Sequence, residues 1–438
     1  MKKTITMLCI AALPAFISVQ AQNKPEPVTK QEKQQAIETI NKLLIADYIY
    51  PQVADKMVST LSTNLKKGNY NSITDPFEFA EKVTADLVSV SNDRHFIIQI
   101  DPDWVHDSKQ AISAKDSLEM ANRDISEFRK DNFGFKDVKI LNGNIGYLNL
   151  IGFCPTSYAG ETAVAAMGLL GNTDAIIIDL RENGGGDSGM VQLLASYFFD
   201  EAPRVLVGFY DRKTNQTEHD YNLQYLPGKR MPAKNLYILT SRGTFSAAEG
   251  FTYIMKNRKR ATIVGENTGG GAHPVEREIV NDRFTIRIPA SRPIDPVTKT
   301  DWEGAGIAPD IAVPVKDALV AAQIKALGDL AAKTTDNQAY LWGIDILKGR
   351  QNPVTIDIET LKTYAGKYGQ RNIVLENGSL YFQKGEGEKH KLIPVGRDVF
   401  LLEDIDDMKI KMVVENGRAA ALNRLFDNGD SRLDKRDE

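Results

Sequence analysis

The sequence has few cysteines: only Cys9 and Cys154 occur among its 438 residues. Cys9 lies in an N-terminal apolar run, so the rest of the chain has one thiol and cannot form an internal disulfide. The five histidines are scattered, without the spacing typical of a metal site. The formal net charge of -4 argues against nucleic-acid or anionic-membrane partners. We therefore expect no metal, no cofactor and no nucleic-acid partner.

Long apolar runs are also lacking, except near the N-terminus. Lys2 and Lys3 precede an apolar stretch from about Ile5 to Val19, and small residues follow at a position suited to a signal peptidase. The stretch is short for a membrane span, which needs roughly 20 apolar residues. We expect residues 1–21 to be a cleaved signal peptide of a periplasmic or secreted protein, with an uncleaved anchor as the alternative.

The periodicity of apolar residues divides the rest of the chain into five segments. Residues 138–315 alternate short apolar strands with helix-like stretches, which predicts an α/β core with a largely parallel sheet. Asn-Gly turns between alternating runs predict a small antiparallel β domain at the C-terminal end. The segments are an N-terminal helical region (22–100), a connector (101–137), the α/β core (138–315), a helical connector (316–351) and the β domain (352–438).

The first segment with possible chemistry is AIIIDLRENGGGDSG, residues 175–189. A buried strand runs into three glycines and a helix, a turn whose backbone N–H groups can hold an anion or an oxyanion. Residues 184–189 also satisfy the G-x-G-x-x-G pattern of dinucleotide-binding loops. The polar residues between the strand and the glycines argue against that alternative.

A second segment, NLYILTSRGTFSAAEGFTYIMKN, places Ser246 between a strand and a helix. A hydroxyl there lies at the positive end of the helix dipole, beside an N–H able to bind an oxyanion. Ser246 and Glu249 also fit a helix capping box, which is the simpler interpretation of the segment alone.

A serine nucleophile needs a base, and a histidine is the obvious candidate. Composition does not select one of the five, which are His95, His106, His219, His273 and His390. Glu303, in TDWEGAGIAPDIAV, could orient a histidine or could serve only as a turn carboxylate.

Four ordered motifs, DLRENGGG, TSRGTFSAAEGF, VGENTGGGAHP and WEGAGIAPDI, together resemble the C-terminal processing peptidases. The resemblance covers roughly residues 35–315 and is strongest to the branch of the tricorn core peptidase and the interphotoreceptor retinoid-binding protein. It implies a crotonase-like β/α catalytic core preceded by a helical region.

The resemblance also implies roles for individual residues. Ser246 falls on the nucleophile, and Gly185, Gly186 and Ala247 fall where backbone amides form the oxyanion hole. Many members use a catalytic lysine, whose place is taken here by Gly271.

In the tricorn-like branch a histidine and a downstream glutamate serve instead, and His95 and Glu303 match them. His273 is an alternative base. Arg94 stands where the tricorn type has a serine, and no peptide-binding PDZ module fits into the connector.

The sequence thus predicts an exported serine endopeptidase acting on peptides or unfolded proteins, with no membrane span after signal cleavage. The alternative from another functional class is a catalytically weak or inactive protein that binds an apolar ligand or peptide on the same core.

Overall fold

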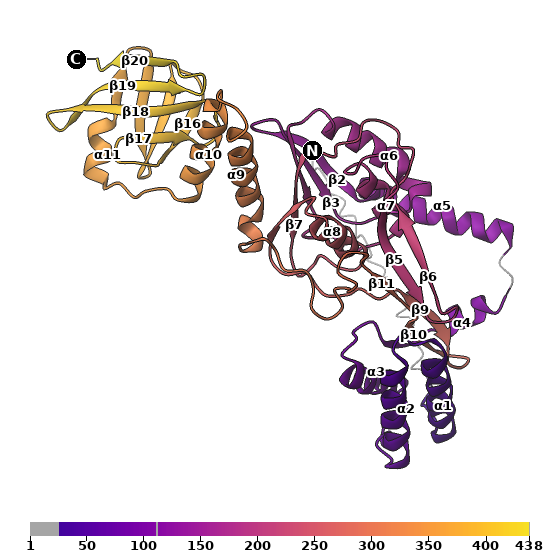
Figure 1. Cartoon of the computed structure of the whole chain (residues 1–438). Coiled ribbons are helices and arrows are strands. Elements are labelled where there is room, and N and C mark those ends of the chain that lie inside the picture. Colours follow the sequence, from indigo (N-terminus) through magenta and orange to yellow (C-terminus); the bar gives the residue numbers. More distant parts are fainter. Residues whose placement is uncertain (1–25, 111–112, 438) are drawn as a thin grey trace, which may run out of the picture.

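The computed structural model describes residues 26–110 and 113–437 and shows an elongated chain (Figure 1). The N-terminal helices lie at one end, the C-terminal β domain at the other, and the α/β core between them. The predicted signal peptide lies outside the described residues. Within the described ranges, no helix combines the length and apolar character needed to span a membrane.

The N-terminal helices pack against a small antiparallel sheet whose strands are distant in sequence. Asp75 caps the third helix by accepting hydrogen bonds from the amides of Phe77 and Glu78. The apolar faces of the helices form one buried cluster with Phe284, Ile286 and Ile288. The elements are α1 (Lys30–Asp47), α2 (Pro51–Lys66), α3 (Pro76–Ser91), β1 (Ile97–Ile100), β9 (Val275–Ile279) and β10 (Phe284–Pro289), with β10 central.

The pairing of β1 with β10 has a direct consequence for the site. It fixes the segment just before β1 against the chain that leads into β9. Residues of the N-terminal region therefore lie beside loops of the α/β core.

The α/β core contains the predicted parallel sheet, in the order β12-β8-β7-β4-β3-β2. Only the β2–β3 pair is antiparallel. Every residue of β4 is buried, because helices cover both faces of the sheet: α6, α7 and α8 on one, α9 on the other. The strands are β2 (Phe135–Leu141), β3 (Ile145–Leu150), β4 (Ala175–Asp179), β7 (Asn235–Thr240), β8 (Thr262–Gly265) and β12 (Ile311–Ala312), and the helices are α6 (Thr156–Leu170), α7 (Ser188–Ser196), α8 (Ala247–Asn257) and α9 (Ala318–Ala331).

Two parts of the core and connector differ from the sequence-based expectation. The apolar run at 205–210 forms β5 (Val205–Asp211), which joins β6 (Gln216–Tyr221) and β11 (Ser291–Ile294) in a separate antiparallel sheet. The connector holds α4 (Pro102–Ser108), α5 (Ala114–Lys130) and the 3-10 turn η1 (Asn132–Gly134). The large apolar residues Leu118 and Met120 of α5 are exposed.

The C-terminal end is an antiparallel sheet of eight strands in sequential order. Both Asn-Gly turns form as predicted, with positive φ at Asn377, Gly378, Asn416 and Gly417. The edges of the sheet approach each other, since the Asp437 amide donates to the Lys367 carbonyl at 2.9 Å. The elements are the 3-10 turn η2 (Val315–Asp317), α10 (Gln338–Gln351), α11 (Ile358–Tyr364), β13 (Gly366–Tyr368), β14 (Arg371–Glu376), β15 (Ser379–Lys384), β16 (Lys389–Pro394), β17 (Val399–Leu402), β18 (Met408–Glu415), β19 (Arg418–Phe426) and β20 (Ser431–Lys435).

Candidate active site

Three loops meet at the carboxyl ends of the neighbouring parallel strands β4, β7 and β8, where open α/β sheets commonly bind ligands. Backbone hydrogen bonds join the loops. The Phe245 amide donates to the Asn183 carbonyl at 3.0 Å, and the Gly269 amide donates to the Thr244 carbonyl at 3.0 Å. The triple-glycine turn, Ser246 and the second glycine run thus form one connected surface.

Ser246 occupies a sharp turn between β7 and α8. Its φ of 53° and ψ of -121° are unusual for a residue with a side chain. Such a conformation costs on the order of 1–3 kcal/mol and persists only when neighbouring contacts impose it. The serine lies at the N-cap of α8, as the sequence predicts, in the strand–turn–helix setting typical of activated serine nucleophiles.

Glu249 holds this turn in place. Its fully buried carboxylate accepts hydrogen bonds from the amides of Ser246 at 3.0 Å and Gly271 at 2.8 Å through Oε2. Through Oε1 it accepts from the Gly270 amide at 2.7 Å and the Thr268 hydroxyl at 2.5 Å. Burial raises the pKa of Glu249, and these donors oppose that shift. The capping glutamate therefore also ties the turn at Ser246 to the second glycine run.

Two of the three predicted oxyanion amides are available. The amides of Gly186 and Ala247 have no hydrogen-bond partner among residues 26–110 and 113–437. The Gly185 amide donates to the Asn183 side chain at 2.9 Å. The prediction of Gly185 as an oxyanion donor is therefore corrected, because its N–H is already occupied. Gly185 instead permits close packing, since a Cβ there would lie 2.8 Å from the Ser246 Cβ.

A cavity of about 610 Å³ opens in front of these groups. Ser246, Gly186 and Ala247 all line it, so a carbonyl at the serine could reach both free amides. Its walls include apolar side chains, among them Leu206, Phe209, Ile254 and Trp302. The site can therefore hold an apolar group next to the serine.

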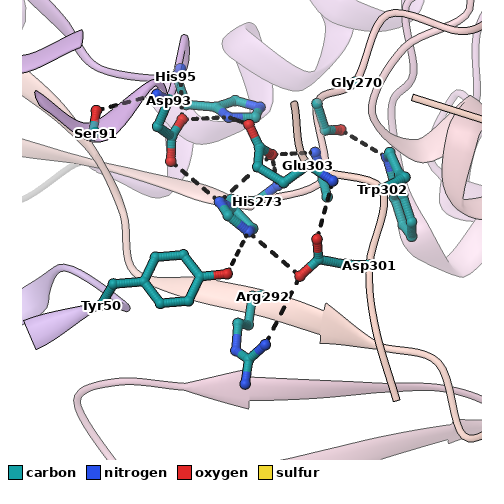
Figure 2. A network of polar contacts seen from close by, with 12 residues as sticks. Tyr50, Ser91, Asp93, His95, Gly270, His273, Arg292, Asp301, Trp302 and Glu303 are labelled. Carbon is teal, nitrogen blue, oxygen red and sulfur yellow. Dashed lines mark hydrogen bonds and ion pairs between the residues drawn. The ribbon is translucent and has the colours of Figure 1, made fainter. Parts of the chain in front are cut away.

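Histidines and carboxylates from distant segments of the chain converge in one cluster (Figure 2). His95 lies between α3 and β1, and its Nδ1 is 3.0 Å from Oδ1 of Asp93. The Asp93 carboxylate also accepts the His95 amide at 3.0 Å. Burial favours a raised pKa for Asp93, but hydrogen bonds from His273 and His95 lower its pKa below the ordinary value. Asp93 therefore fixes both the backbone and the ring of His95.

His273 is more deeply enclosed than His95, with 1% of its side chain exposed against 12%. Its Nδ1 is 3.2 Å from Oδ2 of Asp93, and its Nε2 is 3.6 Å from Oδ2 of Asp301. Burial would lower the pKa of His273, yet the hydrogen bonds to Asp301 and Asp93 raise it to about 9. Both ring nitrogens of His273 thus face carboxylates.

Glu303 lies between the two rings. Its Oε1 is 3.7 Å from Nδ1 of His95, and its Oε2 is 3.5 Å from Nδ1 of His273. The amide of Ala272 donates to Oε2 at 2.7 Å, which anchors the side chain. Burial raises the pKa of Glu303. The carboxylate is close to the predicted base, although Asp93 makes the shorter contact.

The arrangement around the serine distinguishes the two candidate bases. In the described part of the chain, neither histidine makes a hydrogen bond to Ser246, and Nε2 of His95 has no polar partner. The His95 ring packs against that of Phe245, the residue before the serine, with centroids 5.7 Å apart. His95 therefore has a free nitrogen next to the serine turn.

Phe245 also occupies the position where a catalytic lysine would project. A Cβ on Gly271 would lie 2.0 Å from the Phe245 ring. A lysine at residue 271 would therefore require the ring to move, in agreement with the absence of a lysine there.

Asp93 and Asp301 were not among the predicted site residues. Asp93 could have been considered from the sequence, because it stands two residues before His95 and its side chain accepts the His95 amide in a turn. Asp301 stands two residues before Glu303 in a turn, where its Oδ1 accepts a hydrogen bond from the Glu303 amide at 3.0 Å. Nothing in the sequence spacing brings residues 93 and 301 together.

Cys154, the single cysteine in the described residues, is buried and free, and burial raises the pKa of its thiol.

Comparison with known proteins gives matches to two sequence families. Residues 144–313 match peptidase family S41, and residues 27–130 match the N-terminal domain of peptidase S41 in eukaryotic interphotoreceptor retinoid-binding protein. Both segments carry residues of the site described above.

The matches to individual relatives cover a smaller part of the chain than the two family matches together. A tail-specific protease of Haemophilus influenzae is 33% identical over 97 residues, which is 22% of this chain and 13% of the relative. The chloroplastic carboxyl-terminal-processing peptidase 2 of Arabidopsis thaliana is 26% identical over 170 residues, 39% of this chain and 32% of the relative. The matches thus span less than a third of either relative. Among solved structures, a photosystem II D1 C-terminal processing protease is 14% identical, with a TM-score of 0.44 over 67% of this chain and 95% of that one.

Proposed function

We propose that this chain, which belongs to peptidase family S41, cleaves peptide bonds through an acyl-enzyme formed on Ser246. The observation that carries the proposal is the convergence of Ser246 and the unpaired amides of Gly186 and Ala247 on one cavity. A helix cap alone would need neither the strained backbone of Ser246 nor two free amides facing the same space.

The first step uses the serine and a base. The Ser246 oxygen attacks the substrate carbonyl while His95 Nε2 accepts the hydroxyl proton. Asp93 keeps the ring hydrogen on Nδ1, so that Nε2 is the acceptor, and it faces the positive charge that the ring gains. Glu303, at 3.7 Å, adds a second negative group near that charge.

The oxyanion and the leaving group complete the cycle. The amides of Gly186 and Ala247 hold the negative oxygen of the tetrahedral intermediate. His95 then returns its proton to the leaving amine, and water releases the acyl group by the reverse sequence. His95 must approach Ser246 when substrate binds, since catalytic hydrogen bonds often tighten only in the complex.

His273 fits a supporting role better than that of the base. Both of its nitrogens face carboxylates, and its ring is enclosed by Tyr50, which lies 5.6 Å away between centroids. It positions Asp93, and through Asp93 the ring of His95. We also propose that the catalytic core has a crotonase-like fold.

The test is cleavage of an unfolded protein by the wild-type chain and by Ser246→Ala. The variant should lose turnover by several orders of magnitude, because the serine belongs to a unit that acts together. His390→Ala is the matched control, since this ring pairs with Asp404 in the C-terminal domain and should leave turnover unchanged. Equal cleavage by wild type and Ser246→Ala would show that the serine is not the nucleophile.

Export to the periplasm or medium belongs to the same proposal and is supported by the N-terminal residues 1–21. Edman sequencing of the purified chain should begin near Gln22 if the signal is removed. An N-terminus at Met1 in the exported fraction would contradict cleavage.

A further inference from the structure

The charges around the two histidines are out of balance. Asp93, Asp301 and Glu303 bring three carboxyl groups into a region where their side chains are 2%, 12% and 15% exposed. Among the described residues, one arginine pairs with these carboxyl groups: Arg292, which lies 3.9 Å from Asp301. When the carboxyls are ionised, two negative charges remain, which two imidazolium rings or one divalent cation would balance.

Four of these groups have the geometry of a cation site. One ligand atom from each of Asp93, His95, His273 and Glu303 lies within 4.8 Å of the others. Zinc bonds of about 2.0–2.2 Å in a tetrahedron place ligand atoms roughly 3.3–3.6 Å apart. The Nδ1-to-carboxylate distances of 3.0, 3.2, 3.5 and 3.7 Å lie around that value, with Nδ1 of His95 facing Oδ1 of Asp93 and Oε1 of Glu303 and Nδ1 of His273 facing the other oxygen of each carboxylate.

The donor set selects the kind of cation. Two imidazole nitrogens and two carboxylates suit zinc, whereas magnesium and calcium prefer six or more oxygens. One carboxylate oxygen is also available: Oε1 of Glu303 accepts no hydrogen bond within the described residues, whereas Oε2 accepts two backbone amides.

The residues behind the His273 ring resemble those that support metal-bound histidines. If His273 bound a cation through Nδ1, its hydrogen would lie on Nε2, which is 3.6 Å from the Asp301 carboxylate and 3.5 Å from the Tyr50 hydroxyl. A carboxylate behind a metal-bound histidine fixes the ring and strengthens the ligand. Figure 2 shows Asp301 and Tyr50 on the side of the His273 ring away from Asp93.

We propose that Asp93, His95, His273 and Glu303 bind one Zn²⁺ ion and that this ion inhibits the peptidase. The inhibitory part rests on the proposed function. A neutral imidazole bound through Nδ1 carries its only hydrogen on Nε2. His95 Nε2 would then be a donor and could not accept the proton of Ser246.

Binding is tested in the full chain carrying Ser246→Ala, so that the result does not depend on peptidase activity. After dialysis against EDTA, zinc is titrated against a chromophoric chelator, and Co²⁺ absorption reports the coordination geometry. We expect one zinc per chain and the intense visible absorption of tetrahedral Co²⁺. No saturable binding in competition with the chelator would overturn the site and leave only a hydrogen-bonded network.

Variants in the same background locate the site. His95→Ala and Glu303→Gln replace partly exposed groups and should weaken zinc binding by at least 100-fold. Asp301→Asn should weaken it roughly 10–100-fold, the usual effect of losing an outer partner. His390→Ala, at a surface histidine–carboxylate pair, should not change it. Circular dichroism checks the fold of each variant, and zinc affinity that survives both His95→Ala and Glu303→Gln in folded protein would refute the assignment.

Inhibition is measured separately on the zinc-free wild-type chain. Added zinc should suppress peptide cleavage at the concentration that half-saturates the site, and EDTA should restore it. Zinc binding without loss of cleavage would overturn the inhibitory part. A zinc-free chain that cleaves no peptide would instead contradict the proposed function while the binding result stands.

Discussion

Glu249→Gln perturbs the contacts that impose the strained turn at Ser246. The substitution keeps the shape of the side chain but replaces one carboxylate oxygen by an NH₂ group. In the better orientation the amide oxygen still accepts from Ser246 and Gly271, and the NH₂ group faces Gly270 and Thr268. The Thr268 hydroxyl can turn to accept, but the Gly270 amide is left without a partner.

The magnitude follows from those contacts. An unpaired buried amide costs about 1–3 kcal/mol, and the two remaining bonds lose charge assistance worth roughly 1 kcal/mol each. Relief of the buried charge offsets part of this, since burial already raises the pKa of Glu249. We expect the free energy of unfolding to fall by about 2–4 kcal/mol.

Urea unfolding followed by tryptophan fluorescence measures this change. Trp302 is a suitable reporter because its indole N–H donates to the Gly271 carbonyl at 3.1 Å. Glu161→Gln, at an exposed position on α6, is the control and should change stability by less than about 0.5 kcal/mol. A Glu249→Gln chain within 1 kcal/mol of wild type would refute the reasoning, because the four donors would then not depend on an ionised carboxylate.

Three further predictions concern the same loops. His95→Ala should lower kcat by roughly 10²–10⁴-fold, the usual effect of losing a general base, while His273→Ala should retain more activity. The reverse order in steady-state kinetics would assign the base to His273. Gly271→Ala should destabilise the chain by about 1–3 kcal/mol in thermal unfolding, because the added methyl group clashes with Phe245, and Phe245→Leu in the same chain should recover part of that loss. If stability is not recovered, the Phe245 ring is not the source of the strain. Gly185→Ala should lower kcat in a peptide-cleavage assay, because the added Cβ would lie 2.8 Å from the Cβ of Ser246 and the φ of 111° disfavours alanine. An unchanged kcat would argue against close packing at the serine.

Local patterns in the sequence predicted much of the fold correctly. The all-buried strand β4, the Asn-Gly hairpins and the N-cap position of Ser246 each depend on residues adjacent in the chain. The strand at 205–210 is apolar like the parallel strands, but its pairing with β6 and β11 depends on segments far away, which periodicity does not encode. Helix α5 lies in the segment expected only to be a connector, although Leu118, Ile125 and Phe128 recur there at helical spacing.

The candidate site was predictable only where a motif carried it. Ser246, His95 and Glu303 came from the family resemblance, and the structure brings them to one region. The contact of Asp93 with His273 depends on the pairing of β1 with β10, which joins segments about 190 residues apart. The hydrogen bond from the Gly185 amide likewise depends on the orientation of the Asn183 side chain, which a sequence motif does not specify.

The most direct test of the central claim is covalent labelling with a fluorophosphonate probe, followed by mass spectrometry of the digested chain. We expect a single phosphonate adduct on the peptide containing Ser246. The adduct should be absent in Ser246→Ala and form far more slowly in His95→Ala. Intact, folded wild-type chain that forms no adduct at Ser246 after zinc removal would contradict the claim that this serine is an activated nucleophile, and would favour a binding protein on the same core.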